Sequence, residues 1–498
     1  MLKKFIKDIA KYSLSKLLPA LTAFITTPIL TSLFPPEEYG TWALALSVSS
    51  FMIALTVSGF GGAVIRFYPA YKAKSTLNTF FSTIFITTSA ITIFIAGAGL
   101  FFSVSFREFL PSALIEFLPL IIAIFIAQSV FVIYMAVLRA REKSGVFTTF
   151  QLLLNYGGLG LGLVLVIFFD FRVDGLLLGT LLTLLLIVPI LFYVATKGAK
   201  VKARYFKMQD AFHIMDYALP LTIGNVAMWG LRLSDLFIIN FFYTEKDVGL
   251  YSVSYNISAK SIELLVALFL LSVSPLLMNT WEREGQEATE KSLKMVTRVY
   301  LIVCLPAVVG LSVLAFPFVA LLTSPEYYGG YKIFGLVALS SFAWGLANIA
   351  QMGMAIKKRT RRLGANQIMA ALVHITLAIF LVPRFGYAAA AISTLIGYSV
   401  LLILQARSSQ RYISWRFPFS TLRNVLVASL LMGLVAYGIY GLAGDGNDVS
   451  ILYLLLSILI SIAVYSLLLW VLGEVRESEK GMVLQLWNKV SNGKEKKM

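Results

Sequence analysis

The sequence predicts an all-α polytopic membrane protein with fourteen transmembrane helices, arranged as two six-helix repeats plus two C-terminal helices. Three observations predict this: long apolar runs, basic residues confined to alternate loops, and similar segments in the two halves of the chain. Of the 498 residues, 58% are hydrophobic and only 13% are charged, and the mean hydropathy is +0.82. A soluble protein of this composition would expose large apolar areas to water, so the bilayer is the better solvent for it.

The apolar runs have the length that a transmembrane helix needs, about 20 residues at a rise of about 1.5 Å per residue. The first run is too long for a cleaved signal peptide, so we expect it to remain as the first helix. The candidate spans are 12–34, 41–65, 77–102, 114–138, 146–169, 173–195, 218–242, 249–278, 296–321, 331–356, 363–382, 386–405, 422–442 and 450–473.

Lys and Arg are distributed unevenly between alternate loops. Of the 42, 35 lie in the N-terminus, every second loop and the C-terminal tail. The intervening loops hold only Arg107, Arg172, Lys246, Lys332 and Arg384. This positive-inside pattern predicts a multi-pass protein of the cytoplasmic (inner) membrane with both termini in the cytoplasm. It also explains the net charge of +17 as basic loops facing anionic lipid headgroups, so we expect no nucleic-acid partner.

Two segments resemble each other at an offset of 209 residues. Residues 35–43 and 244–252 each contain an acidic turn, then a glycine, then an aromatic residue entering an apolar run. Two copies of six helices plus two extra helices would give fourteen. Because six is even, both copies would have the same orientation, and the repeat axis would run along the membrane normal.

Signals of enzymes and metal sites are scarce. Cys304 is the only cysteine and lies inside a span, which excludes disulfides and thiolate metal sites. His213 and His374 are the only histidines, and no HExxH motif occurs. The glycine-rich run 157–162 lies within a span, so it predicts a helix contact surface and not a dinucleotide site. We therefore expect a protein without catalytic residues, metal or cofactor.

Four charged residues lie inside the seventh and eighth spans. Arg232 and Asp235 share one helix face, as do Lys260 and Glu263, because each pair is spaced i,i+3. A charge near the bilayer midplane costs roughly 2.5–3.5 kcal/mol, so these groups should face each other or a water-filled cavity. The same two helices extend this polar surface with Asn225, Asn240 and Asn256.

These charges have two interpretations. In the first, they form a salt-bridge set that only ties the two helices together. In the second, Arg232 and Lys260 line a cavity for an anionic substrate such as a diphosphate, to which both side chains are suited. Asp235 and Glu263 would then be counter-ions or proton acceptors.

Three further residues are weaker candidates. Arg66 closes the second span at the cytoplasmic face, as an interface anchor or as a substrate contact. Lys16 lies one turn into the first span, where its side chain would extend to the headgroups. His374 lies in the middle of the eleventh span, as a structural core histidine or as a proton relay.

The chain resembles the polysaccharide-export branch of the MOP superfamily, the Wzx-type flippases of lipid-linked oligosaccharides. Four segments along the whole length carry the resemblance. They are Leu-Phe-Pro-Pro-Glu-Glu-Tyr-Gly-Thr-Trp-Ala at 33–43, Arg-Phe-Tyr-Pro-Ala-Tyr at 66–71, Asp-Val-Gly-Leu-Tyr at 247–251 and Ser-Pro-Glu-Tyr at 324–327. No residue here matches an invariant family site, since the cavity charges vary in position within that family.

The resemblance implies a V-shaped, two-lobed MOP/MATE-like transporter whose helices 1, 2, 7 and 8 line a central cavity. The expected parts are an N-lobe (1–195, helices 1–6), a cytoplasmic linker (196–217), a C-lobe (218–405, helices 7–12), helices 13–14 (406–473) and a cytoplasmic tail (474–498).

The implied function is alternating-access transfer of a polyprenyl-diphosphate-linked oligosaccharide across the cytoplasmic membrane, for surface polysaccharide or O-antigen synthesis. The resemblance implies Arg232 and Lys260 as diphosphate contacts, with Arg66, Asn225 and Asn256 as further cavity residues. Asp235, Glu263 and His374 are the candidates for counter-ions or for coupling to H⁺ or Na⁺. Membrane lipids, a polysaccharide polymerase and glycosyltransferases are the expected partners.

Several rival functions stay open. A MATE-like drug/cation antiporter should have an acidic, aromatic site, whereas basic and acidic groups balance here. A peptidoglycan-precursor flippase is a related alternative. A polysaccharide polymerase or ligase should carry a sizeable outside loop, and the sequence has none. A purely structural scaffold would not explain the midplane charges.

Overall fold

The computed structural model describes residues 24–105, 112–441 and 451–474, and nearly all of these residues are helical. The first half contains a short apolar helix at Phe24–Leu33 and then α2 (Pro36–Thr56), α3 (Ser58–Ala73), α4 (Leu77–Ser105), α5 (Ser112–Ala140), α6 (Ser144–Phe169), α7 (Val173–Thr196), the 3-10 turn η2 (Ala203–Tyr205) and α8 (Met208–Phe242). The second half contains α9 (Glu245–Val313), α10 (Ala315–Leu322), η3 (Pro325–Ile333), α11 (Phe334–Ala350), α12 (Met352–Ile356), α13 (Thr360–Phe385), α14 (Ala388–Ser409), α15 (Phe419–Gly441) and α16 (Ile451–Val471).

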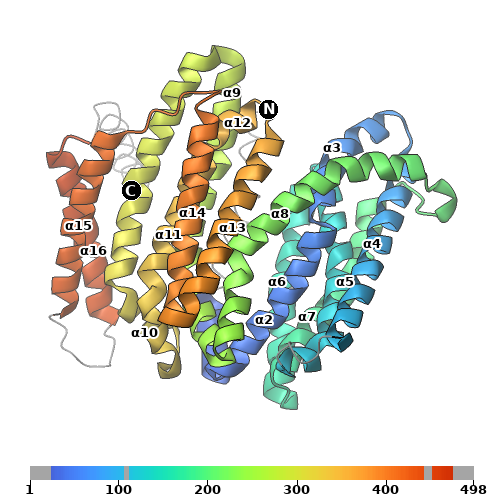
Figure 1. Ribbon diagram of the computed structural model, residues 1–498, viewed down its shortest axis with the longest axis horizontal. Helices are drawn as coiled ribbons and strands as arrows, with labels where there is room; N and C mark the ends of the chain where they lie inside the picture. The colour runs from blue at the N-terminus through green and yellow to red at the C-terminus, as the bar shows by residue number, and fades with distance from the viewer. Residues whose placement is uncertain (1–23, 106–111, 442–450, 475–498) are drawn as a thin grey trace, which may run out of the picture.

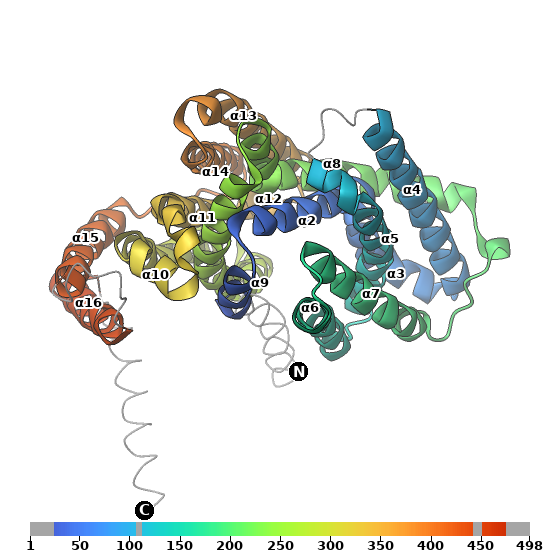
Figure 2. The same cartoon turned by 90° about the horizontal axis from the view of Figure 1, so that it is seen from below.

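The helices form two groups that meet at one end and diverge at the other (Figure 1). Helices α2 to α7 make up one group, and α9 and α11 to α14 make up the other. Helix α8 runs between them and packs on both α3 and α13, while α15 and α16 lie outside the second group against α9 (Figures 1 and 2). This is the two-lobed arrangement that the resemblance implied.

Eleven helices among the described residues are long and apolar enough to cross a membrane. One of them, α9, extends over two predicted spans, and α8 is not among the eleven although its 35 residues would suffice in length. Its composition, which includes the predicted intramembrane charges, therefore keeps α8 out of this set of eleven helices. The chain is a multi-pass membrane protein, but the count of fourteen and the repeat stay predictions. Residues 12–23 of the first predicted span, with Lys16, and the tail 475–498 lie outside the described residues.

Several helices extend beyond the predicted spans, because an apolar span ends at the bilayer while a helix can continue into water. Helix α8 begins at Met208, inside the segment predicted as a linker. The run labelled α9 consists of two helices joined at a kink at Gly285, whose φ of 81° suits glycine, and this kink lies in the polar segment 279–295 between two predicted spans. The second predicted span is divided between α2 and α3 at Val57, directly before a glycine-rich stretch.

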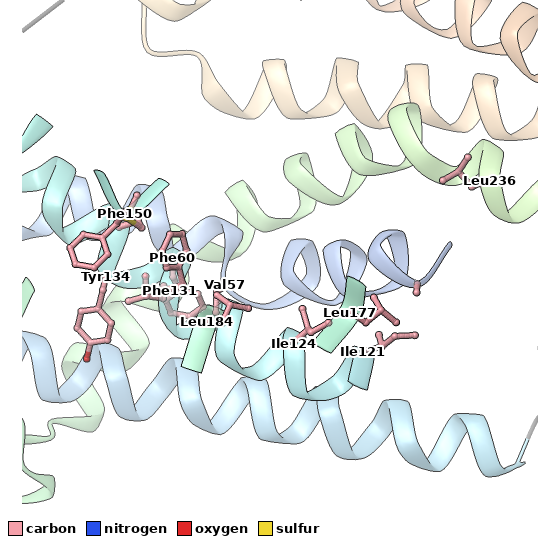
Figure 3. Packing of buried hydrophobic residues seen from close by; sticks show 14 of the residues in the cluster. Val57, Phe60, Ile121, Ile124, Phe131, Tyr134, Phe150, Leu177, Leu184 and Leu236 are labelled. Atoms are coloured by element: carbon pink, nitrogen blue, oxygen red, sulfur yellow. The ribbon is translucent and has the colours of Figure 1, made fainter. Parts of the chain in front are cut away.

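The core of the first lobe is a contiguous set of large apolar side chains. Val57 and Phe60, at the break between α2 and α3, pack with Ile124 and Phe131 of α5 and with Leu184 of α7 (Figure 3). A second core joins α9, α11, α15 and α16, so the last two helices are docked by apolar contacts.

The end where the lobes meet is tied by hydrogen bonds and by an ion pair. The Tyr327 hydroxyl donates to the Phe34 carbonyl at 2.9 Å, and the Ser324 hydroxyl donates to the Thr31 carbonyl at 2.7 Å. Lys246 at the start of α9 lies 3.7 Å from Glu37 at the start of α2. These contacts join segments far apart in the sequence and close the molecule at this end.

Candidate functional site

A single carboxylate between α8 and α9 holds two cationic side chains. Glu263 on α9 accepts a hydrogen bond from the Arg232 guanidinium of α8 through Oε1, and from the Lys260 ammonium through Oε2 at 3.1 Å. Arg232 and Lys260 remain 37% and 35% exposed, whereas Glu263 is 17% exposed. The acid is therefore covered by its two partners, and both cations still face open space.

That space is a cavity of about 390 Å³ lined by all three charged residues and by Asn225, Tyr255 and Asn256. The charged lining residues are two cations and one carboxylate, so the described wall has an excess of one positive charge. In a medium of low dielectric constant, such an excess attracts an anion strongly. The geometry thus favours an anionic ligand over a cationic one.

Aromatic side chains border this cavity. The Trp229 indole donates to the Ser50 hydroxyl of α2 at 3.0 Å and packs on Phe51 with ring centroids 4.4 Å apart. The Arg232 guanidinium also lies 5.9 Å from the Trp344 ring centroid. Trp229 also lines a separate apolar cavity of about 620 Å³ between α2, α4, α5 and α8, so one indole separates a charged space from an apolar one.

Asp235 does not join the charged cavity. It is buried among α9, α13 and α14, where its Oδ2 accepts hydrogen bonds from the Tyr251 and Thr394 hydroxyls, both at 2.6 Å. Its Oδ1 lies 3.3 Å from His374 Nε2, which is also 3.2 Å from the Ser234 hydroxyl. Asp235 and His374 therefore form a buried titratable pair one helical turn from the charged cavity.

A family model described as polysaccharide biosynthesis protein matches residues 29–329, more than half of the chain. The chain belongs to this family. The match spans α2 to α10 and the start of η3, so it includes both the charged cavity and Asp235.

Relatives and solved structures agree with this membership. The probable low-salt glycan biosynthesis flippase Agl15 of Haloferax volcanii is 20% identical over 54% of this chain and 56% of its own length. The probable flippase AglR of the same organism is 25% identical over 47% and 49%. This chain thus spans about half the length of these two relatives. The uncharacterized membrane protein MJ1068 of Methanocaldococcus jannaschii is 22% identical over 91% and 97%.

The solved structures show the fold of the MOP superfamily. The lipid II flippase MurJ in an inward closed conformation gives a TM-score of 0.75 at 16% identity, over 93% of this chain and 98% of that chain. An inward-facing multidrug resistance MATE family transporter gives a TM-score of 0.64 at 15% identity, over 81% and 98%. At these identities, the likeness to a flippase and to a transporter shows the fold.

The remaining predicted site residues lie at different places. Asn225 and Asn256 line the charged cavity. Arg66 does not line it; its guanidinium lies on α3, 5.4 Å from the Tyr217 ring centroid of α8.

Sequence reasoning missed the partners that complete both sites. Tyr251, Thr394 and Ser234 supply hydroxyl groups around Asp235 and His374, and Trp229 forms a wall of the cavity. Tyr251 sits in a segment that carried the family resemblance, which could have marked it. Thr394 lies in an apolar run with no distinguishing signal.

Proposed function

We propose that this protein is a flippase that moves a polyprenyl-diphosphate-linked oligosaccharide across the cytoplasmic membrane by alternating access. The observation that carries the proposal is the membrane-embedded cavity in which Arg232 and Lys260 share one carboxylate. A diphosphate would neutralise the excess positive charge of the cavity wall, and both side chains would donate charge-assisted hydrogen bonds to it. The polyprenyl chain would stay in the lipid, and the glycan would serve surface polysaccharide assembly, of which O-antigen synthesis is one case.

The charge balance of the cavity argues against the rival antiporter of organic cations. Such a ligand would need surplus carboxylates, but Glu263 already carries two cations. A cationic drug entering the cavity would have to displace Arg232 or Lys260 from the acid that they share. Anionic cargo is therefore the better match to this wall.

The closed end of the molecule defines a starting state for the transport cycle. With the basic loops in the cytoplasm, the joined end of α2 and α9 faces outside, and the lobes diverge toward the inside. The cavity would then load from the inner leaflet and release to the outer leaflet after the joined end opens. We propose both cytoplasmic termini, the fourteen helices and the two six-helix repeats as parts of this arrangement.

We further propose H⁺ as the coupling ion, bound by Asp235 and His374. The Asp235 carboxylate accepts two hydroxyl hydrogen bonds on one oxygen and has an imidazole beside the other. A proton on His374 would therefore neutralise the charge of the carboxylate. A Na⁺ ion would need several oxygen ligands in the space that the imidazole occupies. Because Asp235 and Arg232 lie on the same helix, α8, a change at the pair can be transmitted to the cavity.

The experiment deletes the gene in its host, or in a host whose own flippases are removed, and restores wild type, Arg232→Ala, Lys260→Ala or Lys291→Ala. Lys291 is the matched control, since it forms an exposed ion pair with Glu287. Surface glycan and the leaflet location of lipid-linked intermediates are measured. The proposal expects glycan loss and inner-leaflet intermediates in the deletion and in both cavity variants, with rescue by Lys291→Ala.

Two results would contradict the proposal. Normal surface glycan in the deletion would remove the flippase function. Full rescue by properly inserted Arg232→Ala and Lys260→Ala variants would leave the charges as a tie between two helices. Glycosyltransferases and a polymerase, proposed as partners, would be identified by co-purification with the restored wild type.

A further inference from the structure

A second polar cavity lies next to the charged one, on the side of the first lobe. It measures about 390 Å³ and is lined by side chains of α2, α5, α6, α7 and α9. Its polar wall includes Tyr39, Trp42, Gln128, Asn155, Thr180 and Asn256. Every described lining residue is uncharged, in contrast to the neighbouring cavity with its three charges.

This concentration of amide and hydroxyl groups is costly within membrane-spanning helices. A polar group kept from water costs free energy unless it finds a hydrogen-bond partner. The Trp42 Nε1 is buried and, among the described residues, has no such partner.

Asn256 connects the two cavities. It lines both of them, and Tyr39 lines the uncharged one with it. In a lipid-diphosphate-linked glycan, the first sugar is bonded directly to the diphosphate. If the diphosphate binds to Arg232 and Lys260, the first sugar can lie beside Asn256, where the charged cavity adjoins the uncharged one.

We propose that this uncharged cavity binds the first sugar of the substrate and selects a neutral sugar at that position. The inference rests on the proposed function and specifies its substrate class. Amides and hydroxyls can both donate to and accept from sugar hydroxyls, while Trp42 and Tyr39 supply rings for the apolar faces of a sugar. A uronic acid would bring an ionised carboxylate into a wall without a cation among its described residues, and it would lose its hydration there.

The test uses the purified full chain in lipid nanodiscs and three probes of equal lipid length. They are farnesyl diphosphate, farnesyl diphosphate linked to glucose, and farnesyl diphosphate linked to glucuronic acid. Affinities are measured by calorimetry. For wild type we expect the glucose probe to bind about tenfold more tightly than farnesyl diphosphate, as one or two net neutral hydrogen bonds would give. The glucuronic acid probe should gain nothing.

Variants assign the gain to the cavity. Gln128→Leu and Asn155→Leu should abolish the glucose gain while leaving the affinity for farnesyl diphosphate unchanged, which also verifies that the variants fold. Thr180→Val, a change that keeps the side-chain shape, should reduce the gain partially. The control is Gln367→Leu, an amide on α13 that lines none of the three cavities described above.

The outcomes separate this inference from the proposed function. If farnesyl diphosphate binds but glucose adds nothing, if the glucuronic acid probe binds most tightly, or if the variants keep the full gain, the neutral-sugar subsite is overturned and the flippase proposal stands. If none of the probes binds to wild type, the cationic cavity itself is not a diphosphate site, and both proposals fall.

Discussion

Gly40 and Gly249 each pack against the backbone at the start of the other's helix. A Cβ atom on Gly40 of α2 would overlap the Glu245 carbonyl of α9, and a Cβ atom on Gly249 would overlap the Pro36 carbonyl of α2. The two glycines are separated by the offset of 209 residues at which the sequence segments resemble each other, and so are Pro36 and Glu245. A reciprocal contact of this kind is what a local twofold axis produces.

Replacing either glycine should hold the joined end apart. In Gly40→Ala or Gly249→Ala, the methyl group meets backbone atoms that cannot rotate away, and overpacking of this kind costs about 1–3 kcal/mol. We expect the equilibrium to move toward a state with the α2–α9 contact open. Spin labels at Phe171 and Lys332 would report a longer distance population in these variants. Gly97→Ala is the control, because a Cβ atom there meets nothing within 4 Å. Unchanged distances in all three variants would contradict the closing role of the contact.

Glu263→Gln should destabilise the ligand-free protein and increase the stabilisation that a bound anion provides. The change removes the acid shared by Arg232 and Lys260 and leaves two like charges in one cavity. Breaking a buried ion pair costs about 3–5 kcal/mol, and partial exposure of both cations lowers the expected loss below that range. Thermal unfolding should begin at a lower temperature, and farnesyl diphosphate should raise the unfolding temperature more than in wild type. An equal or smaller ligand effect would favour the purely structural salt-bridge set.

Transport should depend on pH through His374. Histidine is the side chain whose charge normally changes between about pH 5 and 8. If the proton on the Asp235–His374 pair drives the cycle, its occupancy and the transport rate fall as the pH rises. His374→Gln should remove this dependence, whereas His213→Gln, the only other histidine, should retain it. Dependence of the wild-type rate on Na⁺ at constant pH would refute H⁺ coupling.

A buried ion pair fixes the end of α16 to α9. Arg298 lies 3.4 Å from Glu474, which also accepts hydrogen bonds from Thr421 and Asn424 of α15, each at 3.1 Å. Since both charged residues are almost fully buried, Glu474→Gln should lower the free energy of unfolding by about 3 kcal/mol. The exposed pair of Glu287 and Lys291 is the comparison, and Glu287→Gln should leave the free energy of unfolding nearly unchanged, because solvent screens this pair. Equal losses in chemical unfolding would show that burial of the pair has no effect.

Individual elements show how far sequence reasoning reached. The apolar run that predicted a span at 173–195 agrees with α7, because both ends of that helix coincide with polar turns. Helix α8, in contrast, begins at Met208, before its apolar run, and the helices on both sides of the kink at Gly285 extend into the polar segment 279–295. The i,i+3 spacing correctly placed Lys260 beside Glu263, but the same spacing did not pair Arg232 with Asp235.

The sequence by itself determined the membrane class, the two-lobed MOP-type fold through its family resemblance, and the helices that carry charge. It could do so because apolar runs, spacing along a helix and loop charges are local properties of the chain. Only the tertiary structure decided that Glu263 holds both cations, that Asp235 turns away to His374, and that Asn256 joins a charged cavity to an uncharged one. Those relations depend on the rotation of each helix about its axis, and packing against distant helices sets that rotation.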